Sequence, residues 1–193
     1  MMRKKVHSKR LILRPLRKSD YTKWFDTYVN CPPSKNKWDL RPCSAQQCKK
    51  SKFIKRIKSH RKLANDDHYY WYGVFHKKSA ELIGQIDFTV FFRESLQFCN
   101  FGYQIYNRHW SKGYGQEAAR AGLKIGFRQL KLHRLEAAIN LDNKKSIRLA
   151  KAIGMHREGI KKRYWFENGK WVDHLIYVAT PEDILSKPAN RTS

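Results

Sequence analysis

The chain has 193 residues, of which 13% are aromatic and 30% charged, a composition typical of a folded domain and not of a disordered segment. Its 41 Lys and Arg residues against 16 Asp and Glu give a formal net charge of +25, so the protein should attract anions and repel polycations. No apolar stretch is long enough to span a bilayer, and Arg14 and Pro15 interrupt the apolar run near the basic N-terminus. We therefore expect a cytoplasmic protein without a membrane segment or signal peptide.

The four cysteines do not form a metal-binding pattern. Cys31, Cys43 and Cys48 are too unevenly spaced for a compact zinc site, and no closely spaced pair of histidines follows them. Free thiols and no metal are expected, as is usual for a cytosolic protein.

The first half of the chain contains patterns of both strands and helices. The predicted elements are a strand over 10–16, a short amphipathic helix over 18–30, a proline-rich loop over 31–46, a helix over 47–65, and two strands within 69–92. Ser19 or Asp20 is placed to cap the first helix. Residues 49–62 carry eight Lys or Arg residues and no acid, so the second helix is the most cationic element.

The second half alternates strands and helices less regularly than a repeating βαβ array. The predicted elements are a strand within 95–107, a helix after the glycines of the next segment, a strand over 133–140, a helix over 146–153 and a hairpin over 162–179. Gly154 is expected just after the last helix, and Asn168-Gly169 is a strong hairpin turn signal. The order predicts a single α/β domain with a mixed sheet.

Residues 109–118, HWSKGYGQEA, resemble a phosphate-binding loop at the start of a helix. Unpaired N–H groups and a partial positive charge at a helix N-terminus stabilise phosphate, and glycines let the backbone approach it closely. Lys112 adds a positive charge. Glu117 needs no catalytic role, because an acid near a helix N-terminus is favourable in itself. From the loop alone, a dinucleotide, another phosphate-bearing cofactor or a simple chain turn remain open.

The neighbouring segments disfavour a dinucleotide. That site needs a buried apolar strand before the glycines and an acid at the end of the next strand. The preceding strand is half polar, with Gln97, Asn100 and Gln104, and Glu136 lies near the start of its own strand. No second βαβ unit follows.

Six motifs in order give the chain a family resemblance that covers about residues 10–180. They are RLILRPLRKSD, LIGQIDF, FGYQI, WSKGYGQEA, HRLEAAINLDNKKSIRLAKAIGMHREG and NGKWVDHLIY. The chain resembles the GCN5-related N-acetyltransferases (GNAT), and within them the RimJ/RimL-type branch of ribosomal-protein N-terminal acetyltransferases. Trp110 fits this branch, whereas many other members of the superfamily carry Arg or Gln there. The resemblance implies an α/β fold: one GNAT-type domain over 1–193, with short flexible ends and a mixed, largely antiparallel sheet flanked by helices.

The resemblance also implies acetyl-coenzyme A as the cofactor. Its pyrophosphate would lie on the backbone N–H groups of Ser111, Lys112, Gly113, Tyr114, Gly115 and Gln116. Its pantetheine arm would run along Gln104, Ile105 and Tyr106. Asn143 would contact the cofactor, and Ser146 would protonate the departing thiolate. The same Asn-x-x-Ser spacing would equally serve as a helix cap, so the residues alone leave both roles open.

The general base is the least defined part of the expected site. Many relatives place Glu where this chain has Asn100, which cannot take a proton but can hold a water that does. Other candidates are Tyr103, Asp87, Glu94, Asp173 and His174, and strand alternation directs only one of the last two toward the acceptor. An N-terminal amine does not require a strong base, because its pKa is near 8.

The acceptor is expected to be an amine on a protein or peptide, and to be anionic. In the family the second helix borders the acceptor cleft, and here that helix is basic. Association with the ribosome or RNA would fit this charge, as would the basic and aromatic segment GIKKRYW at 159–165. The alternatives are a nucleic-acid- or ribosome-binding module with little catalysis, and a small-molecule amine acetyltransferase. A monomer or a homodimer is expected.

Overall fold

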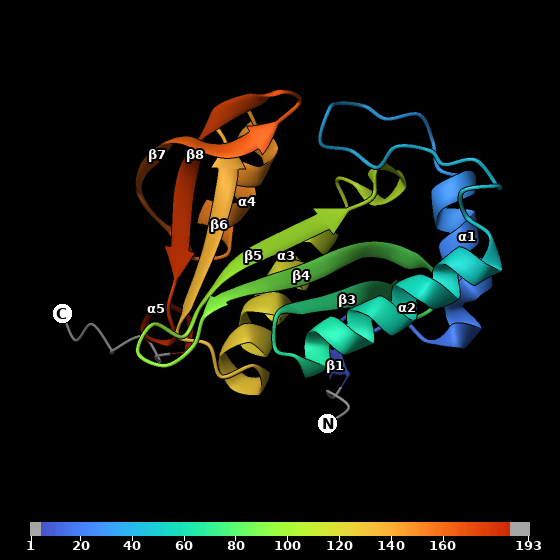
Figure 1. The fold of residues 1–193 in the computed structure, drawn as a ribbon, viewed down its shortest axis with the longest axis horizontal. Helices are drawn as coiled ribbons and strands as arrows, with labels where there is room; N and C mark the ends of the chain where they lie inside the picture. Colours follow the sequence, from blue (N-terminus) through green and yellow to red (C-terminus); the bar gives the residue numbers. More distant parts are fainter. Residues whose placement is uncertain (1–4, 186–193) are drawn as a thin grey trace. The chain divides into compact units, whose positions relative to one another are not determined.

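A computed structural model describes residues 5–185 (Figure 1). The predicted flexible ends lie largely outside these residues. The elements are β1 (Val6–His7), β2 (Leu11–Arg14), the 3-10 turn η1 (Lys18–Asp20), α1 (Tyr21–Val29), α2 (Lys50–Asn65), β3 (Tyr69–His76), β4 (Leu82–Phe92), β5 (Phe98–Ile105), the 3-10 turn η2 (Asn107–His109), α3 (Tyr114–Lys124), the π-helix η3 (Ile125–Gln129), β6 (Arg134–Asn140), α4 (Lys144–Ala152), β7 (His156–Glu167), β8 (Lys170–Ala179) and α5 (Pro181–Leu185). None of the described helices is both long and apolar enough to cross a bilayer.

The strands form an eight-stranded sheet in the order β1-β2-β3-β4-β5-β6-β8-β7. Strands β5 and β6 pair in parallel, whereas the β1–β2, β2–β3, β3–β4, β6–β8 and β7–β8 pairs are antiparallel. The predicted mixed, largely antiparallel sheet with flanking helices is therefore confirmed.

The chain divides into two compact units, which are described separately below. The first contains the described residues up to Val90 together with Gly102–Gly122. The second contains Phe91–Phe101 and the described residues from Leu123 onward. Strand β5 contributes its second half to the first unit and its first half to the second.

In the first unit, α2 lies across one face of the strands and α3 runs behind them (Figure 1). The predicted amphipathic helix is α1, whose aromatic residues face inward: Trp24 and Tyr28 are buried and Phe25 packs beside them. They meet Phe53 and Ile57, the buried residues of α2, and the strand residues Trp71 and Phe75. The other side of α2 is left to its lysines and arginines.

The start of α1 differs from the prediction. Asp20 occupies the N-cap position, but its side chain makes no capping hydrogen bond to the helix. Its carboxylate accepts two hydrogen bonds from the Arg14 guanidinium, at 2.6 and 2.7 Å, and one from the Arg17 N–H at 2.7 Å. Burial raises the pKa of this carboxyl, but these bonds outweigh burial and the net pKa is lowered. Asp20 therefore ties the end of β2 to η1.

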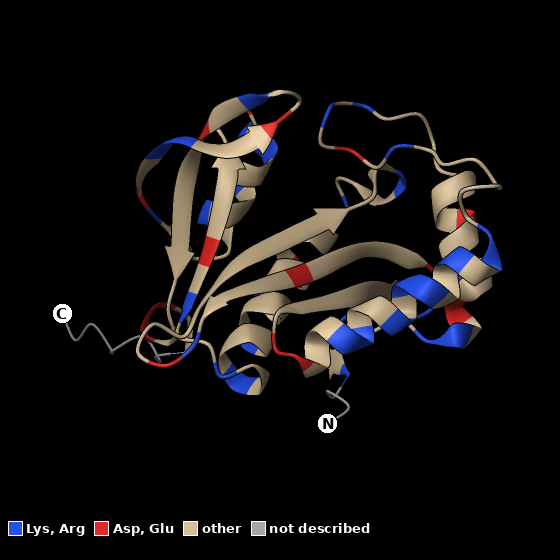
Figure 2. Cartoon of the chain, in the orientation of Figure 1, with Lys and Arg blue, Asp and Glu red and all other residues tan. Residues whose placement is uncertain are grey.

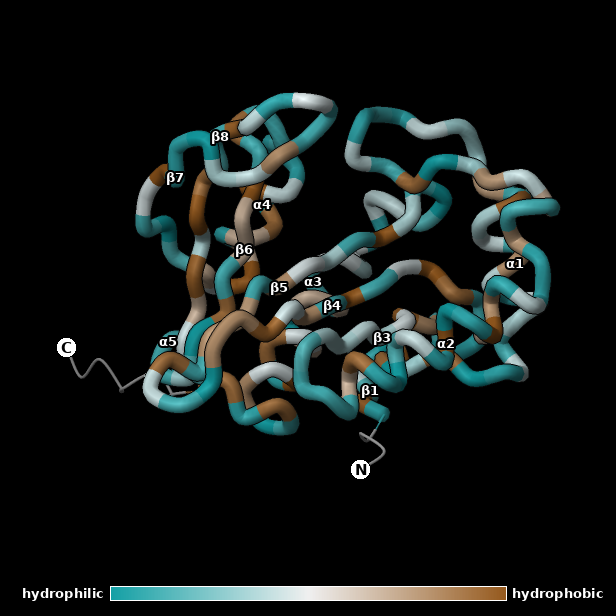
Figure 3. The backbone as a smooth tube through the Cα atoms, in the orientation of Figure 1, coloured by the Kyte–Doolittle hydropathy of each residue, from teal (hydrophilic) through white to brown (hydrophobic). Residues whose placement is uncertain are grey.

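The second unit is built around β6, with β8 beside it and α4 in contact with it. Hydrophobic residues fill the end of β8, which is brown in Figure 3, and Ile176, Val178 and Ala179 are buried. Gly154 follows α4 with φ at +93°, and the β7–β8 turn places Asn168 and Gly169 at φ values of +49° and +82°. Both positive-φ predictions are confirmed. Strand β7 begins at His156, earlier than expected, and neither η3 nor α5 was predicted.

Candidate active site

The glycine loop leaves a run of backbone donors unused. Ser111 and Gly113 adopt φ values of +61° and +76°, and α3 begins at Tyr114. The first helical bond runs from the Glu117 N–H to the Gly113 carbonyl, at 3.3 Å. Within residues 5–185, the N–H groups of residues 111–116 make no hydrogen bond. These donors, beside Lys112 at a helix start, fit the pyrophosphate of coenzyme A.

Glu117 fastens this loop to strand β2. Its carboxylate accepts hydrogen bonds from the Ser8 hydroxyl at 2.7 Å, the Arg10 N–H at 2.5 Å and the Arg10 Nε at 2.7 Å. Arg10 also donates to the Lys112 carbonyl at 2.8 Å and covers the Tyr114 ring. Burial raises the pKa of Glu117, but the hydrogen bonds from Arg10 and Ser8 lower it by a larger amount. The net pKa is therefore below its usual value. The residue anchors the loop, a larger role than favourable charge at a helix start.

Some hydrogen-bonding groups at the end of β5 already bond to other residues of the protein. Gln104 Nε2 donates to the Trp38 carbonyl at 3.0 Å, and the Trp110 indole donates to the Ile105 carbonyl at 2.5 Å. The Tyr106 N–H is bonded to the Ile83 carbonyl at 3.0 Å. A pantetheine arm along residues 104–106 would therefore use the remaining backbone groups of this segment.

In the second unit, the Asn-x-x-Ser pair forms a helix cap. Asn143 is the N-cap of α4, and its Oδ1 accepts from the Ser146 N–H at 3.1 Å. This cap bond uses the Ser146 backbone N–H, and a part of the Ser146 hydroxyl in thiolate protonation stays a prediction.

Asn100 lies on β5 opposite Glu136 of the parallel neighbour β6. Glu136 is 2% exposed, but it is bound by Lys161 at 2.6 Å and by Arg134 at 3.4 Å. A carboxylate held by two cations is a poor proton acceptor, so Glu136 does not replace the Glu that this chain lacks at Asn100.

Asp87 of β4 is the candidate base that is least engaged by other groups. Its residue partner on β3 is Trp71, and a Cβ built on Gly102 would lie 2.5 Å from its Oδ2. Its one hydrogen bond, from Gln85 Nε2, is long at 3.5 Å, and it makes no ion pair within the described residues. Although the residue as a whole is half-buried, its carboxyl group lies deep, and burial raises its pKa to about 6.

The groups around Asp87 do not supply a compensating cation. Tyr69 on β3 is neutral, because burial and then the Asp87 charge raise its pKa. His60 of α2 packs edge-on against Tyr69 and at a tilt against Trp71, and burial and the Arg56 charge lower the pKa of His60 to about 4. Arg56 acts on Tyr69 and His60 and contributes no resolved effect to Asp87.

The other predicted bases are engaged or exposed. Asp173 accepts from the Arg163 N–H at 2.8 Å and pairs with Lys162 at 3.2 Å. His174 is buried and contacts Glu167 at 3.2 Å. Glu94 is exposed in a turn with φ at +43°.

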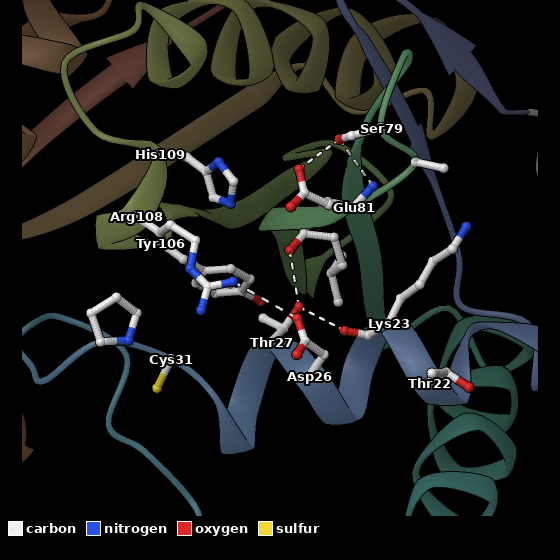
Figure 4. A pocket seen from close by; sticks show the side chains of 13 residues that line it. Thr22, Lys23, Asp26, Thr27, Cys31, Ser79, Glu81, Tyr106, Arg108 and His109 are labelled. Carbon is white, nitrogen blue, oxygen red and sulfur yellow. Dashed lines mark hydrogen bonds and ion pairs between the residues drawn. The ribbon is translucent and has the colours of Figure 1, made fainter.

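A small cavity in the first unit was not anticipated from the sequence (Figure 4). It measures about 200 Å³ and lies between α1, the β3–β4 turn and the segment after β5. Tyr106 alone among the predicted site residues lines it. Its polar side chains largely satisfy one another, as in the 2.6 Å bond from Ser79 to Glu81 and the 3.1 Å bond from Thr27 to the Leu82 carbonyl. Three separate segments of the chain form this cavity, so no single sequence motif could predict it.

The structure offers no metal site in the part it describes. No group of three His, Cys, Asp or Glu side chains within residues 5–185 could hold a metal ion, and all four cysteines are free thiols.

The mixed sheet, with a phosphate-type loop between β5 and α3, defines the class of coenzyme A-dependent acyltransferases. The model of the acetyltransferase (GNAT) domain matches residues 10–156, and the chain belongs to this family, whose members use acetyl-coenzyme A.

Three similar proteins place the chain among relatives. It is 34% identical over 130 residues to the probable N-acetyltransferase YjcK of Bacillus subtilis, covering 67% of this chain and 72% of YjcK. It is 32% identical over 114 residues to the [ribosomal protein uS5]-alanine N-acetyltransferase of Escherichia coli, covering 59% of each. The structure of Mycobacterium smegmatis RimJ in complex with CoA-disulfide matches with a TM-score of 0.78 at 22% identity, over 95% of this chain and 90% of RimJ, and supports the fold.

Proposed function

We propose that this acetyltransferase acts on the N-terminal amine of a protein, and that the acceptor is anionic or ribosome-associated. The observation that carries the cofactor assignment is the run of unbonded N–H groups at 111–116 beside Lys112. The similarity to an enzyme that acetylates alanine of ribosomal protein uS5 supports a protein acceptor. The net charge of +25 supports an anionic one, because a cationic acceptor would be repelled.

The residues of this chain divide the chemistry among them. Bound acetyl-coenzyme A supplies an activated acetyl thioester. The residue 111–116 loop holds the pyrophosphate, with Glu117 and Arg10 fixing the loop to β2. When the amine nitrogen bonds to the acetyl carbon and the carbon–sulfur bond breaks, Asp87 would accept the amine proton, and the Ser146 hydroxyl would pass a proton from solvent to the departing sulfur. Asn100, at the position where many relatives carry Glu, would orient a water.

Asp87 suits this task because its pKa of about 6 leaves it mostly ionised at neutral pH. A base with a pKa somewhat below the working pH combines a high ionised fraction with useful basicity. An N-terminal amine, with a pKa near 8, loses its proton far more readily than a lysine side chain. A weak base such as Asp87 is therefore suited to an N-terminal amine, whose pKa is low for an amine.

Two measurements test the function. Acetyl-coenzyme A should raise the melting temperature. Acetyl-pantetheine, which has the same thioester arm but lacks the pyrophosphate, should raise it less. Free thiol release should then be compared for peptides with an acidic or a basic body behind a free N-terminal alanine, and for spermidine. We expect fastest release with the acidic peptide. Faster release with spermidine than with either peptide would refute the protein acceptor.

The second candidate function is a nucleic-acid- or ribosome-binding module with little catalysis. Asn100 favours it, because Asn cannot serve as a base where many relatives carry Glu. Cofactor binding without thiol release for any amine tested would support this alternative over the enzyme.

A further inference from the structure

The β7–β8 hairpin exposes a group of aromatic side chains that the acetyltransferase reaction does not use. Trp165, Phe166 and Trp171 are 40%, 58% and 60% exposed. Single exposed hydrophobic residues are common, but a cluster of large ones on a soluble protein marks an interaction surface. Trp165 and Lys170 leave the other face of the hairpin, because successive strand residues alternate. We call Phe166 and Trp171 the aromatic hairpin surface, and Lys170 adjoins it at the hairpin turn.

Phe166 and Trp171 form a ring pair at the end of this hairpin. They are direct partners in the antiparallel register, so their side chains leave the same face of the hairpin. Their ring centroids lie 5.4 Å apart with an interplanar angle of 58°. The pair stabilises the hairpin, yet more than half of each side chain is exposed to solvent. The two rings are tilted toward each other, so each offers its own exposed surface to a ligand.

The charges around the ring pair are unevenly satisfied. Each acid of the hairpin is engaged: Glu158 with Arg134, Glu167 with His174 and Asn140, and Asp173 with Lys162. By contrast, Lys170 and the Arg163 guanidinium make no ion pair within the described part of the chain. Figure 2 shows the resulting blue segments along β7 and beside the hairpin turn. The hairpin therefore combines exposed rings with two cations that form no ion pair, and the Arg163 charge also acts on Asp173.

We propose that the aromatic hairpin surface binds single-stranded nucleic acid. A base stacks on the Phe166–Trp171 pair, and the phosphates on either side lie against Lys170 and Arg163. Stacking needs an unpaired base, so a duplex could use only the cations. A second copy of this chain would bring the same cations to the surface and be repelled. An acidic protein would neutralise the cations but bring no array of bases to cover the rings.

Binding is measured by fluorescence polarisation of labelled oligonucleotides of about 12 bases, a length in the range of single-strand sites. The full chain is titrated with single-stranded RNA, single-stranded DNA and a duplex of the same sequence. Polyglutamate of matched charge is the competitor that represents an acidic protein. We expect both single strands to bind more tightly than the duplex, and affinity to fall as salt rises.

Two variants and a matched control locate the surface. F166S combined with W171S should weaken single-strand binding about tenfold or more, because each stacked base contributes substantially. K170Q should lower the salt dependence of binding. F92S is the control, since Phe92 of β4 is 59% exposed, much like Trp171, but lies outside the hairpin. Thiol release should stay unchanged in all three variants, which separates this proposal from the proposed enzymatic function. F166S/W171S should lower the melting temperature slightly, because the ring pair also stabilises the hairpin, so binding is compared at a temperature where every variant is folded.

Three results would overturn the proposal. One is single-strand affinity that survives F166S/W171S, which would place any binding elsewhere, for example on α2. Another is that polyglutamate displaces the labelled oligonucleotide from every variant as effectively as an unlabelled single strand does. The third is a protein that self-associates in sedimentation and becomes monomeric in F166S/W171S, because a second copy would then cover the surface.

Discussion

Replacing Glu117 with Gln should destabilise the protein and weaken the cofactor loop together. The carboxylate lies at the first turn of α3 and holds three donors of the β1–β2 segment at 2.5–2.7 Å. Gln preserves the shape, and its Oε1 can still accept from the Ser8 hydroxyl and the Arg10 N–H, but its NH2 group cannot accept from Arg10 Nε. The change therefore removes the negative charge and the acceptor for one of the three bonds.

The size of the effect follows from the bonding. A hydrogen bond to a charged group contributes about 1.5–3 kcal/mol, compared with about 0.5–1.5 kcal/mol for a neutral one. Two weakened bonds and one lost bond would give about 3 kcal/mol or more, and the 40% exposure of the Arg10 side chain reduces this through solvent screening. We expect about 2 kcal/mol. For a chain of this length that corresponds to a drop in melting temperature of about 4–8 °C.

The effect should also depend on pH in a defined direction. The pKa of Glu117 is lowered in the folded protein. Its stabilising contribution is therefore fully present above the unfolded carboxyl pKa of about 4.3, and is lost as the pH falls through the lower folded value. The difference between wild type and E117Q should be constant from neutral pH to about pH 5 and should shrink in stronger acid.

Urea denaturation at a series of pH values measures this, with D66N as the control. Asp66 pairs with Lys62 at 2.6 Å, but the two side chains are 40% and 79% exposed, so its loss should cost less than about 0.5 kcal/mol. The reasoning fails if E117Q costs no more than D66N at neutral pH. It fails equally if the E117Q difference does not change in acid. Acetyl-coenzyme A should also bind E117Q more weakly, as measured by calorimetry.

Three further changes test other parts of the site. D87N should lower kcat/KM by about 10²–10⁴. In the wild type the rate should fall below about pH 6, where Asp87 becomes protonated, and D87N should abolish this fall. If the rate of D87N still falls in acid, the base is another group. G102A should cost about 1–3 kcal/mol in urea denaturation, because the new Cβ would lie 2.5 Å from Asp87 Oδ2, and an unchanged stability would contradict that packing. N143A should cost about 1 kcal/mol through loss of the α4 cap, and calorimetry with acetyl-coenzyme A then separates the roles, since an unchanged cofactor affinity would leave Asn143 with the cap alone.

The parts of the fold that local chemistry determines could be predicted from the sequence. Asn168-Gly169 favours positive φ at both positions, which a tight hairpin needs, and the structure has it. The apolar spacing of Trp24 and Tyr28 placed them on one buried face. The resemblance to a family added the largely antiparallel character of the sheet, which local patterns do not specify.

Asp20 shows where local reasoning failed. Its position at a helix start predicted a cap, yet its carboxylate turns to Arg14 and Arg17. A capping bond and a pair with Arg14 are both compatible with the same sequence, and the charged partner gives the stronger hydrogen bonds. The choice depends on how Arg14 leaves β2, which residue spacing does not reveal.

In the candidate site, too, some features follow from local sequence and others depend on contacts between distant residues. Its cofactor loop is made of backbone groups, whose availability follows from two glycines and a helix start in one short segment. The ion pair that holds the loop joins Arg10 and Glu117, which are 107 positions apart, and no local pattern links them. The pKa of Asp87 likewise depends on its burial beside Trp71 and Gly102, contributed by two other strands.

This division has a consequence for the acceptor. A loop of backbone N–H groups recognises pyrophosphate whatever the surrounding side chains are, so the same cofactor site can persist while the acceptor side changes freely. The residues that we propose for acceptor chemistry in this chain are Asn100, where many relatives carry Glu, and Asp87, and we propose that the lysine-rich α2 attracts the acceptor. A base with a pKa of about 6 can deprotonate an N-terminal amine far more effectively than a lysine, whose pKa lies about 2.5 units higher. Acetylation should therefore favour the α-amine even on a peptide that also offers lysines.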